Sequence, residues 1–458
     1  MLTAAWIAAA AGALGAAGLL RRRARRARAA AMPPPGRPMG SFERLFDCLH
    51  PLGGFVVVVA ARVAGPLDER LLEKALADLQ DRHPLLRVKV AGPGGCFEAG
   101  AGPIPLRTPP RRDAASWKAV AAEELHRPIP HGPDPLIRAV WLGGEGGGEL
   151  ILTANHAILD GLSCLAVLRG ILQACVARQQ GLAPEAVAST RVPALDDGLP
   201  PGARGRLPPP RRERPLAWDG KAGPAERRSR VDYLALSPAE TAALADRCRA
   251  EGTTVHGAVS AAALLAFREA LGPGRPLVLT SNVNLRPLLA PPVEEGVVGC
   301  FISGVSTRHA AGPDVPFWDL AREVRAEVAA ATARGEPLRA AARPFRPWMA
   351  FLARHLLPRV GQGRLGDVNV SNLGRSDVQE PGGPLRLVEA YCMASQHAVG
   401  HGLQVGLWTL DGTLFATLTH VAPLLSPARA EVLARTLLGL LRRAGAAGDF
   451  TLGDGVAG

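Results

Sequence analysis

Short runs of β-branched residues alternate with segments that carry apolar residues at helical spacing. Residues 55–63, FVVVVAARV, are typical of a β-strand. Leucines and alanines recur every three or four residues over 71–79, which predicts a helix that ends before Pro84, and LLRVKV then resumes a strand. Residues 136–157 predict a hairpin around the segment GGEGGG, and a helix follows over 162–177. Together these elements predict an αβ unit.

The second half of the chain has the same kind of pattern. Its helix starts carry side chains that can cap a helix, and a proline stands at one first helical position. The predicted features are helices beginning after Ser237, Thr254 and Ser426, a strand that runs into a loop over 276–289, a strand over 366–374, and a hairpin over 403–421 with Asp411-Gly412 as its turn.

A stretch rich in Pro, Gly and Arg, without periodicity, separates the two halves. Because 458 residues are more than one hydrophobic core usually serves, we expect an α/β protein with two lobes and a site between them. The predicted division is an N-terminal segment 1–28, a Pro-rich linker 29–41, an N-terminal lobe 42–196, an inter-lobe linker 197–229, a C-terminal lobe 230–447 and a tail 448–458.

Composition indicates a globular protein that does not bind nucleic acid. Hydrophobic residues make up 47% of the chain and charged residues 21%. The net charge of +12 is concentrated in 1–42 and 204–230, so the remainder is nearly neutral and offers no basic face for phosphates. The seven cysteines include no CxxC pair, which indicates neither a zinc site nor a disulfide framework and favours a reducing compartment such as the cytosol.

The N-terminus combines an apolar run with a basic cluster. Residues 1–20 are long enough to cross a bilayer, and RRRARRAR follows directly, an order that holds the arginines in the cytoplasm. Two other readings stay open: translation starts at Met32 or Met39, or the segment lies on the membrane surface. We therefore expect a cytoplasmic protein, anchored to the cytoplasmic face of the membrane if residues 1–28 are an anchor.

The candidate chemistry lies in LILTANHAILDG, residues 150–161. A single histidine is more often a core residue than a catalytic one. Here, however, Asp160 and Gly161 stand where a strand must turn into a helix, and glycine allows a tight backbone there. An aspartate at such a corner can pair with a buried arginine and stiffen the loop. A neutral imidazole held in this way can take a proton from an attacking hydroxyl or amine.

Three competing sites are weaker. GLSCL (161–165) is not a hydrolase elbow, since Leu165 replaces the second glycine. Cys164 would lie in a first helical turn, where the helix dipole lowers a thiol pKa, yet no histidine partner is evident. HAVGH (397–401) lacks a glutamate, and Gly400 argues against a helix, so we expect no metal site.

Several segments together resemble one superfamily. NHAILDG resembles the HHxxxDG motif of the condensation-domain and chloramphenicol-acetyltransferase superfamily of acyltransferases, and LADLQDRHPLLRV resembles the RHxxLR segment of condensation domains. RAEGTTVHGAVSAAALLAF resembles the helix entry of their second lobe. VNLRPLLAPPVEEGVVGCFIS is similar to a segment of the mycobacterial phthiocerol dimycocerosyltransferases, and VSNLG resembles the crossover strand. The similarity covers about residues 40–447.

The resemblance implies two stacked chloramphenicol-acetyltransferase-like lobes, with mixed sheets covered by helices and a solvent tunnel between them. One substrate enters from each face, and the acyl group passes directly from a thioester without a covalent acyl-enzyme. The residues that it implicates are His156 as general base, Asp160 and Gly161 as structural residues, Arg87, Arg82 and Arg286 (in that order) as partners of Asp160, and Ser371 or Asn372 as donors toward the tunnel.

We therefore expect a monomeric acyltransferase that uses acyl-CoA or an acyl carrier protein as co-substrate and a hydrophobic alcohol as acceptor, with no bound cofactor or metal. N-acylation or peptide-type condensation on an amine is the alternative in the same fold, and a non-catalytic acyl- or carrier-binding module is a third. The departure from the motif is Asn155 in place of its first histidine. Related alcohol acyltransferases carry HxxxDG alone, so we expect Asn155 to face away and to form structural hydrogen bonds.

Overall fold

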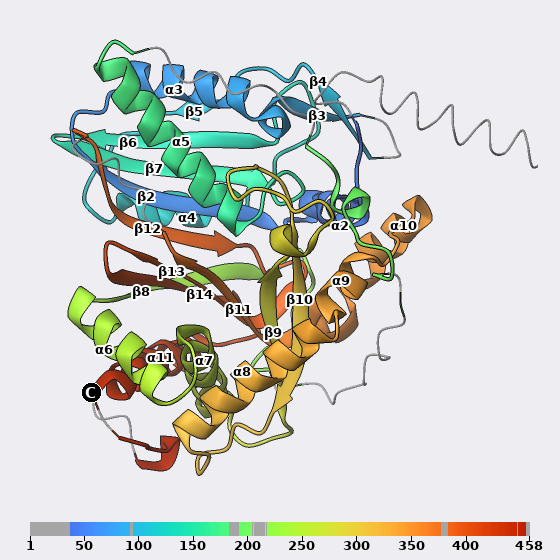
Figure 1. Cartoon of the computed structure of the whole chain (residues 1–458), viewed down its shortest axis with the longest axis vertical. Helices are drawn as coiled ribbons and strands as arrows, with labels where there is room; N and C mark the ends of the chain where they lie inside the picture. The colour runs from blue at the N-terminus through green and yellow to red at the C-terminus, as the bar shows by residue number, and fades with distance from the viewer. Residues whose placement is uncertain are drawn as a thin grey trace, which may run out of the picture.

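The computed structural model describes residues 37–91, 95–182, 192–203, 205, 216, 218–376, 383–446 and 448–454. Two lobes are stacked, and each contains a mixed β-sheet with helices on its outer face (Figure 1). This arrangement confirms the predicted two-lobe α/β class. The N-terminal segment 1–28 lies outside the described residues, so its role as an anchor stays a prediction.

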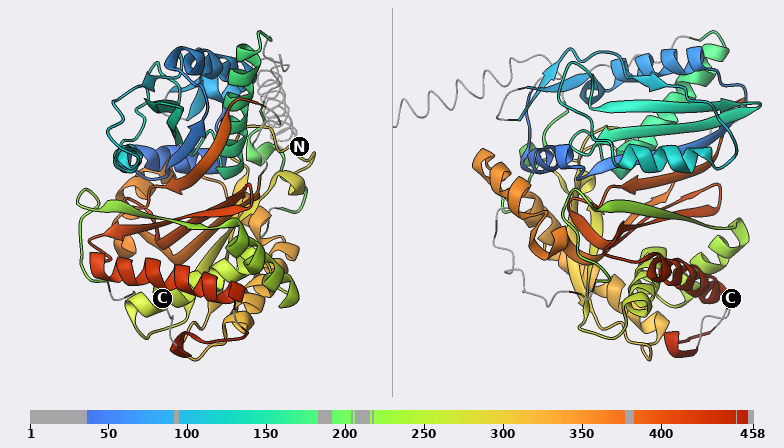
Figure 2. Two further views of the ribbon diagram at one scale, coloured as in Figure 1. Left: turned by 90° about the vertical axis from the view of Figure 1, so that its left-hand side faces the viewer. Right: turned by 180° about the vertical axis from the view of Figure 1, so that it is seen from behind.

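The first lobe is built around a five-stranded sheet in the order β12-β2-β7-β6-β5. Helices α3 and α5 cover its outer face, α4 lies on the face toward the second lobe, and a small β1-β4-β3 sheet stands at one end (Figures 1 and 2). Its elements are β1 (Arg37–Pro38), α2 (Ser41–Leu49), β2 (Val56–Ala64), α3 (Glu69–Arg82), β3 (Val88–Ala91), β4 (Cys96–Ala99), β5 (Leu106–Arg107), α4 (Ser116–Leu125), β6 (Ile137–Gly144), β7 (Gly147–Asn155) and α5 (Gly161–Gln179).

The second lobe contains a six-stranded sheet in the order β10-β9-β11-β13-β14-β8, with α6, α7, α8 and α11 on its outer side (Figure 1). The elements of this half of the chain are β8 (Arg228–Leu236), α6 (Pro238–Ala250), α7 (Val255–Leu271), β9 (Leu277–Asn284), β10 (Ile302–His309), α8 (Phe317–Ala333), α9 (Glu336–Ala341), α10 (Pro347–Leu356), β11 (Arg364–Arg375), β12 (Arg386–Ala394), β13 (Gly400–Leu410), β14 (Thr413–Ala422) and α11 (Pro427–Ala446).

The local signals in the sequence explain the element ends. Asp68 caps α3 by accepting a hydrogen bond from the Leu71 amide at 2.7 Å, and Pro84 follows where the helix stops. In the β13–β14 hairpin, Asp411 and Gly412 both have positive φ, 46° and 79°, as a two-residue turn of this hand requires. The predicted strands, hairpins and capped helices are all present.

One strand crosses between the lobes, and it is not the one expected. VSNLG lies in β11, which stays in the second sheet between β9 and β13. The next strand, β12, leaves that lobe and pairs antiparallel with β2 at the edge of the first sheet. The expected boundary at 230–447 therefore assigns β12 to the wrong sheet, because a sequence pattern shows a strand without showing its partner.

The lobes are joined by buried aromatic side chains. Trp117 of α4 stacks on Tyr391 of β12, with ring centroids 5.4 Å apart, and meets Tyr233 of β8 edge-on at 4.7 Å. Tyr391 also contacts Phe415 of β14 at 5.3 Å. Since these rings come from both sheets, their packing fixes how one lobe sits on the other.

Two expected linkers contain ordered structure. Arg37 lies in the expected linker 29–41, yet its buried guanidinium pairs with Glu43 at 2.6 Å. β8 begins at Arg228, inside the expected linker 197–229. At the other end of the chain, Phe450 of the expected tail is buried against Phe317, with centroids 4.8 Å apart. Among the described helices, α5 alone is long and apolar enough to span a membrane, and most of it is buried in the first lobe.

Candidate active site

Residues 156–160 form the corner between β7 and α5. Asp160 is the N-cap of α5, and its carboxylate accepts a hydrogen bond from the Ser163 amide at 2.9 Å. The Asp160 amide donates to the carbonyl of Gly299 at 3.1 Å, and the His156 amide donates to the carbonyl of Phe55 at 3.3 Å. The corner is thus held by its own helix, by β2 and by a segment of the second lobe.

Asp160 forms a buried ion pair with Arg286. The guanidinium reaches both carboxylate oxygens, at 2.7 and 3.2 Å, and the two side chains are 1% and 0% exposed. The Phe301 amide donates to Asp160 at 2.9 Å, and the Ser163 hydroxyl bridges Asp160 to the Gly299 carbonyl. Every oxygen of this carboxylate is therefore satisfied, as a buried charge requires.

The expected order of arginine partners is wrong. Arg87 lies on the 3-10 turn after α3, where it pairs with exposed Asp81 at 3.9 Å. Arg82 lies at the end of α3. Arg286 directly follows β9, and the adjacent strands of the second lobe bring it beneath the corner. Arg87 and Arg82 are nearer to Asp160 in the sequence and belong to the same lobe, whereas its partner, Arg286, comes from the other lobe.

The His156 ring is half-buried between two aromatic side chains. It stacks on Phe46 of α2 with centroids 4.5 Å apart at 26°, and the Phe55 ring lies edge-on at 6.3 Å. Its Nδ1 is buried with no hydrogen-bond partner of good geometry. None of the described residues hydrogen-bonds Nε2, which is the nitrogen left to meet a ligand. The histidine is therefore held by packing and by its backbone, not by a side-chain hydrogen bond.

Burial lowers the pKa of His156 below its ordinary value of 6.5. The carbonyl groups of His156 and Leu159, together with the Asp160 carboxylate, act in the opposite direction but do not cancel the effect. The imidazole is therefore neutral at pH 7, the form that can accept a proton.

Asn155 is held in a structural network, as expected. Its side-chain carbonyl accepts from the Ala157 amide at 3.0 Å, and its NH₂ donates to Asp47 at 2.9 Å. The same Asp47 oxygen is 2.8 Å from the imidazole of His131. Asn155 thereby ties the end of β7 to α2, the helix that carries Phe46.

The expected donors on β11 lie close to this corner. Leu373 of β11 packs against Gly161, so Ser371 and Asn372 lie just before that contact, and both are half-buried. The Asn372 side-chain oxygen accepts from the Gly374 amide at 2.8 Å, which makes a local turn. This bond uses the oxygen alone and leaves the Asn372 NH₂ able to donate, so Ser371 and Asn372 both stay candidate donors to a substrate.

Gly161→Ala is expected to destabilise the corner by about 1–3 kcal/mol, because an added Cβ would lie 2.3 Å from a methyl carbon of Leu373. Denaturant unfolding measures this. Gly132→Ala is the matched control, since a Cβ there meets nothing within 4 Å. Equal stability of the two variants would show that β11 does not press on the start of α5.

The competing nucleophiles are not activated. The Ser163 hydroxyl is buried and is engaged by Asp160, Arg286 and Gly299. A hydrogen bond with the Cys392 thiol, together with burial, raises the pKa of Cys164 well above its usual value, contrary to the expected effect of the helix dipole. His397 and His401 are largely buried, and burial lowers both pKa values to about 3. No group of three metal-ligating side chains occurs among the described residues.

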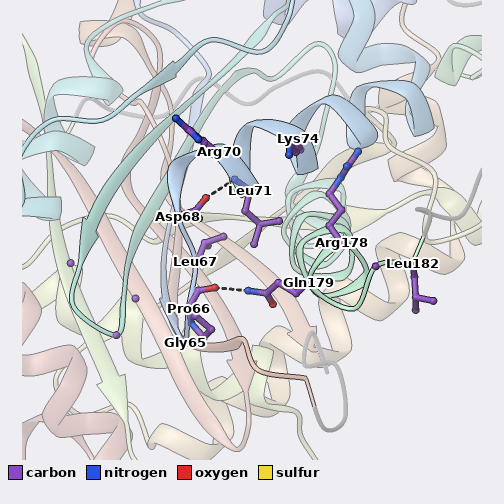
Figure 3. A pocket seen from close by; sticks show the side chains of 14 residues that line it. Gly65, Pro66, Leu67, Asp68, Arg70, Leu71, Lys74, Arg178, Gln179 and Leu182 are labelled. Atoms are coloured by element: carbon purple, nitrogen blue, oxygen red, sulfur yellow. Dashed lines mark hydrogen bonds between the residues drawn. The ribbon is translucent and has the colours of Figure 1, made fainter.

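The structure has a surface hollow of about 810 Å³ at the other end of β7 (Figure 3). It is bordered by the GGEGGG hairpin turn and by the ends of α3 and α5, with Arg70 and Lys74 on its rim. Gly147 begins β7 there, whereas Asn155 ends the same strand at the corner. This hollow is thus separate from His156, and the tunnel expected between the lobes stays a prediction.

The sequence analysis missed the two phenylalanines beside His156. Val56 pairs with Asn155 in the antiparallel β2–β7 ladder, so the preceding Phe55 lies opposite His156. Pairing the two predicted strands in this register would have found Phe55. Phe46 comes from α2, which was not predicted, although Phe42, Leu45, Phe46 and Leu49 recur at helical spacing and could have shown the helix. That spacing does not place the helix beside His156.

Three comparisons with known proteins bear on this site. Residues 225–399 match the family model described as phthiocerol/phthiodiolone dimycocerosyl transferase C-terminus. A probable nonribosomal peptide synthetase, CymA of Salinispora arenicola, is 31% identical over 153 residues. That match covers 32% of this chain and 2% of the synthetase, so this chain corresponds to a small part of its length.

Solved structures share the fold of the whole chain. Polyketide synthase associated protein 5 from Mycobacterium tuberculosis has a TM-score of 0.61 at 17% identity, covering 90% of this chain and 97% of that one. Trichothecene 15-O-acetyltransferase from Fusarium sporotrichioides has a TM-score of 0.68 at 11% identity, covering 90% and 95%. Condensation domains of peptide synthetases are also among the structural matches. At these identities the likeness shows the fold.

Proposed function

We propose that the chain is a member of the superfamily of condensation domains and chloramphenicol-acetyltransferase-like acyltransferases, and that it transfers an acyl group from a thioester to the hydroxyl group of a hydrophobic alcohol. The observation that carries this proposal is the neutral, half-buried imidazole of His156, held beside a buried Asp160–Arg286 pair. Support for an oxygen acceptor comes from the family match over residues 225–399.

The proposed reaction needs one base and no acyl-enzyme. His156 Nε2 accepts the hydroxyl proton as the alcohol oxygen attacks the thioester carbonyl, and a tetrahedral intermediate forms. The carbon–sulfur bond then breaks, and the imidazolium returns the proton to the departing thiolate. A thioester carbonyl is already electrophilic, so alignment and support of the oxyanion complete the catalysis. We assign Ser371 and Asn372 as the candidate donors to that oxyanion.

The donor is proposed to be acyl-CoA or an acyl carrier protein. The relation to a peptide synthetase supports a carrier-bound donor, and it also favours amine acylation as the second candidate function. Ser163 and Cys164 take no covalent part in this scheme, because one is engaged by the ion-pair network and the other is a protonated thiol.

A panel assay tests the proposal. The protein is mixed with acyl-CoA and acyl-carrier donors of several chain lengths and with matched alcohols and amines, and the products are identified by mass spectrometry. Esters are the expected product. If only amides form, ester formation is ruled out and amine acylation is supported. Thioester binding without turnover across the panel would favour a non-catalytic module.

The acid limb of kcat/KM is expected below pH 6.5, since burial lowers the pKa of His156. Activity should be constant near neutrality, where the imidazole is unprotonated, and should fall as the pH drops through this lowered pKa. Initial rates from about pH 5 to 8, corrected for uncatalysed thioester hydrolysis, measure it. A limb centred above pH 6.5 would show that a different group, or a protonated His156, controls the rate.

A further inference from the structure

An exposed apolar surface lies on α10 and the segment after it. Trp348 and Phe351 are 63% and 66% exposed, although both are large aromatic side chains. We define the α10 patch as the exposed apolar residues of this region: Trp348, Phe351, Leu352, Leu356, Val360 and Leu365. Single exposed apolar residues are ordinary, but Trp348, Phe351, Leu352 and Leu356 recur at helical spacing on α10, and a group of this kind marks an interaction surface.

The charges around the patch are all of one sign. The sequence from 337 to 366 contains six arginines and no aspartate or glutamate. Arg343, Arg346 and Arg359 are exposed and add positive charge to the same segment as the apolar side chains. The chain outside the basic segments 1–42 and 204–230 is nearly neutral in total, so the six arginines of 337–366 are a local concentration of positive charge.

The patch also lies next to the candidate active site. The opposite face of α10 packs on α2, where the Cys48 thiol is 3.3 Å from the Ala350 carbonyl and Arg354 donates to the Cys48 carbonyl at 2.9 Å. The same helix α2 carries Phe46, which stacks on His156. One short helix thus separates the exposed apolar side chains from the imidazole.

We propose that the α10 patch binds the surface of an anionic phospholipid bilayer. Trp, Phe and Leu on one face of a helix insert at the boundary between head groups and acyl chains, and flanking arginines pair with lipid phosphates. The helix projects from the edge of the molecule (Figures 1 and 2), a convex shape that suits a bilayer. A second copy of the chain would bring the same arginines face to face.

Membrane binding by α10 stands without the proposed chemistry. If the proposed function also holds, the patch brings the region around His156 to a surface where a hydrophobic alcohol is dissolved. That consequence rests on the proposed function, whereas the binding itself is measured without turnover.

Vesicle flotation with the full chain tests the proposal. The vesicles are phosphatidylcholine alone or phosphatidylcholine with phosphatidylglycerol, and the protein is wild type or carries Trp348→Glu with Phe351→Glu. Leu182→Glu is the matched control, since Leu182 is 58% exposed on the far side of the first lobe. Trp348→Phe, in vesicles with brominated lipids, reports whether Trp348 itself enters the bilayer.

The expected result is binding to anionic vesicles that the double variant weakens about tenfold or more and the control leaves unchanged. Bromolipid quenching should also decrease in Trp348→Phe. Unchanged binding of the double variant overturns the proposal and assigns any membrane contact to another part of the chain. Absence of vesicle binding also overturns the proposal. Binding of an acidic carrier protein or of a second copy at α10 would then identify what the patch contacts instead. Circular dichroism of each variant shows whether the fold is retained.

Discussion

His156→Ala is expected to lower kcat/KM by about 10²–10⁴-fold, the usual contribution of a positioned general base. The ring makes no hydrogen bond of good geometry to a described side chain, so its removal breaks no side-chain polar network. The fold should therefore survive, with a modest loss of stability from the lost stacking on Phe46. Product formation under saturating donor, with denaturant unfolding in parallel, measures both effects.

His355→Ala is the matched control for this prediction. His355 is exposed on α10 and is separated from the corner by α2, so the same change of residue type should leave activity with a soluble acceptor unchanged. Full activity of His156→Ala would remove the imidazole from the mechanism. The remaining explanation would be catalysis by alignment alone, and the pH limb predicted for His156 should then also be absent.

The helix caps and hairpin turns of the fold could be predicted because they depend on residues that are neighbours in the sequence. Asp68 before α3, Ser237 before α6 and Asp411-Gly412 in the last hairpin each act over a few residues. The corner at Asp160 and Gly161 follows the same logic. A strand that must become a helix within five residues needs a cap and a small residue, and both are readable in the sequence.

The parts that could not be predicted depend on contacts between lobes. Arg286 lies 126 residues from Asp160, and only the path of β9 brings it to the corner. Likewise β12 looks like any other strand of the second half, yet it completes the first sheet. Phe46 comes from α2, whose apolar residues Phe42, Leu45, Phe46 and Leu49 do follow a helical period, but that period does not show which loop the helix packs against. In each case the sequence shows the type of residue or strand. Its contact partner depends on how the chain folds in three dimensions.

Arg286→Met is expected to destabilise the protein by about 3–5 kcal/mol, because it leaves the Asp160 carboxylate buried without its counter-charge. The Asp160 oxygens would keep hydrogen bonds from Ser163 and Phe301, so the corner need not unfold outright. Activity should fall together with stability, since the same ion pair positions the loop that carries His156. Urea unfolding and initial rates measure the two effects separately.

Asp160→Asn separates the charge from the shape of the corner. Asparagine keeps one acceptor for the Ser163 amide but leaves Arg286 charged and buried, so this variant should also be strongly destabilised. Combining Asp160→Asn with Arg286→Met removes both charges, and the double variant should be more stable than either single one. Arg249→Met is the control, because Arg249 pairs with Asp246 on the exposed surface and should change stability by about 0.5 kcal/mol or less. If the two single effects simply added, the pair would not act as a unit, and the rigidity of the corner would have to come from packing against Leu373 and Phe301.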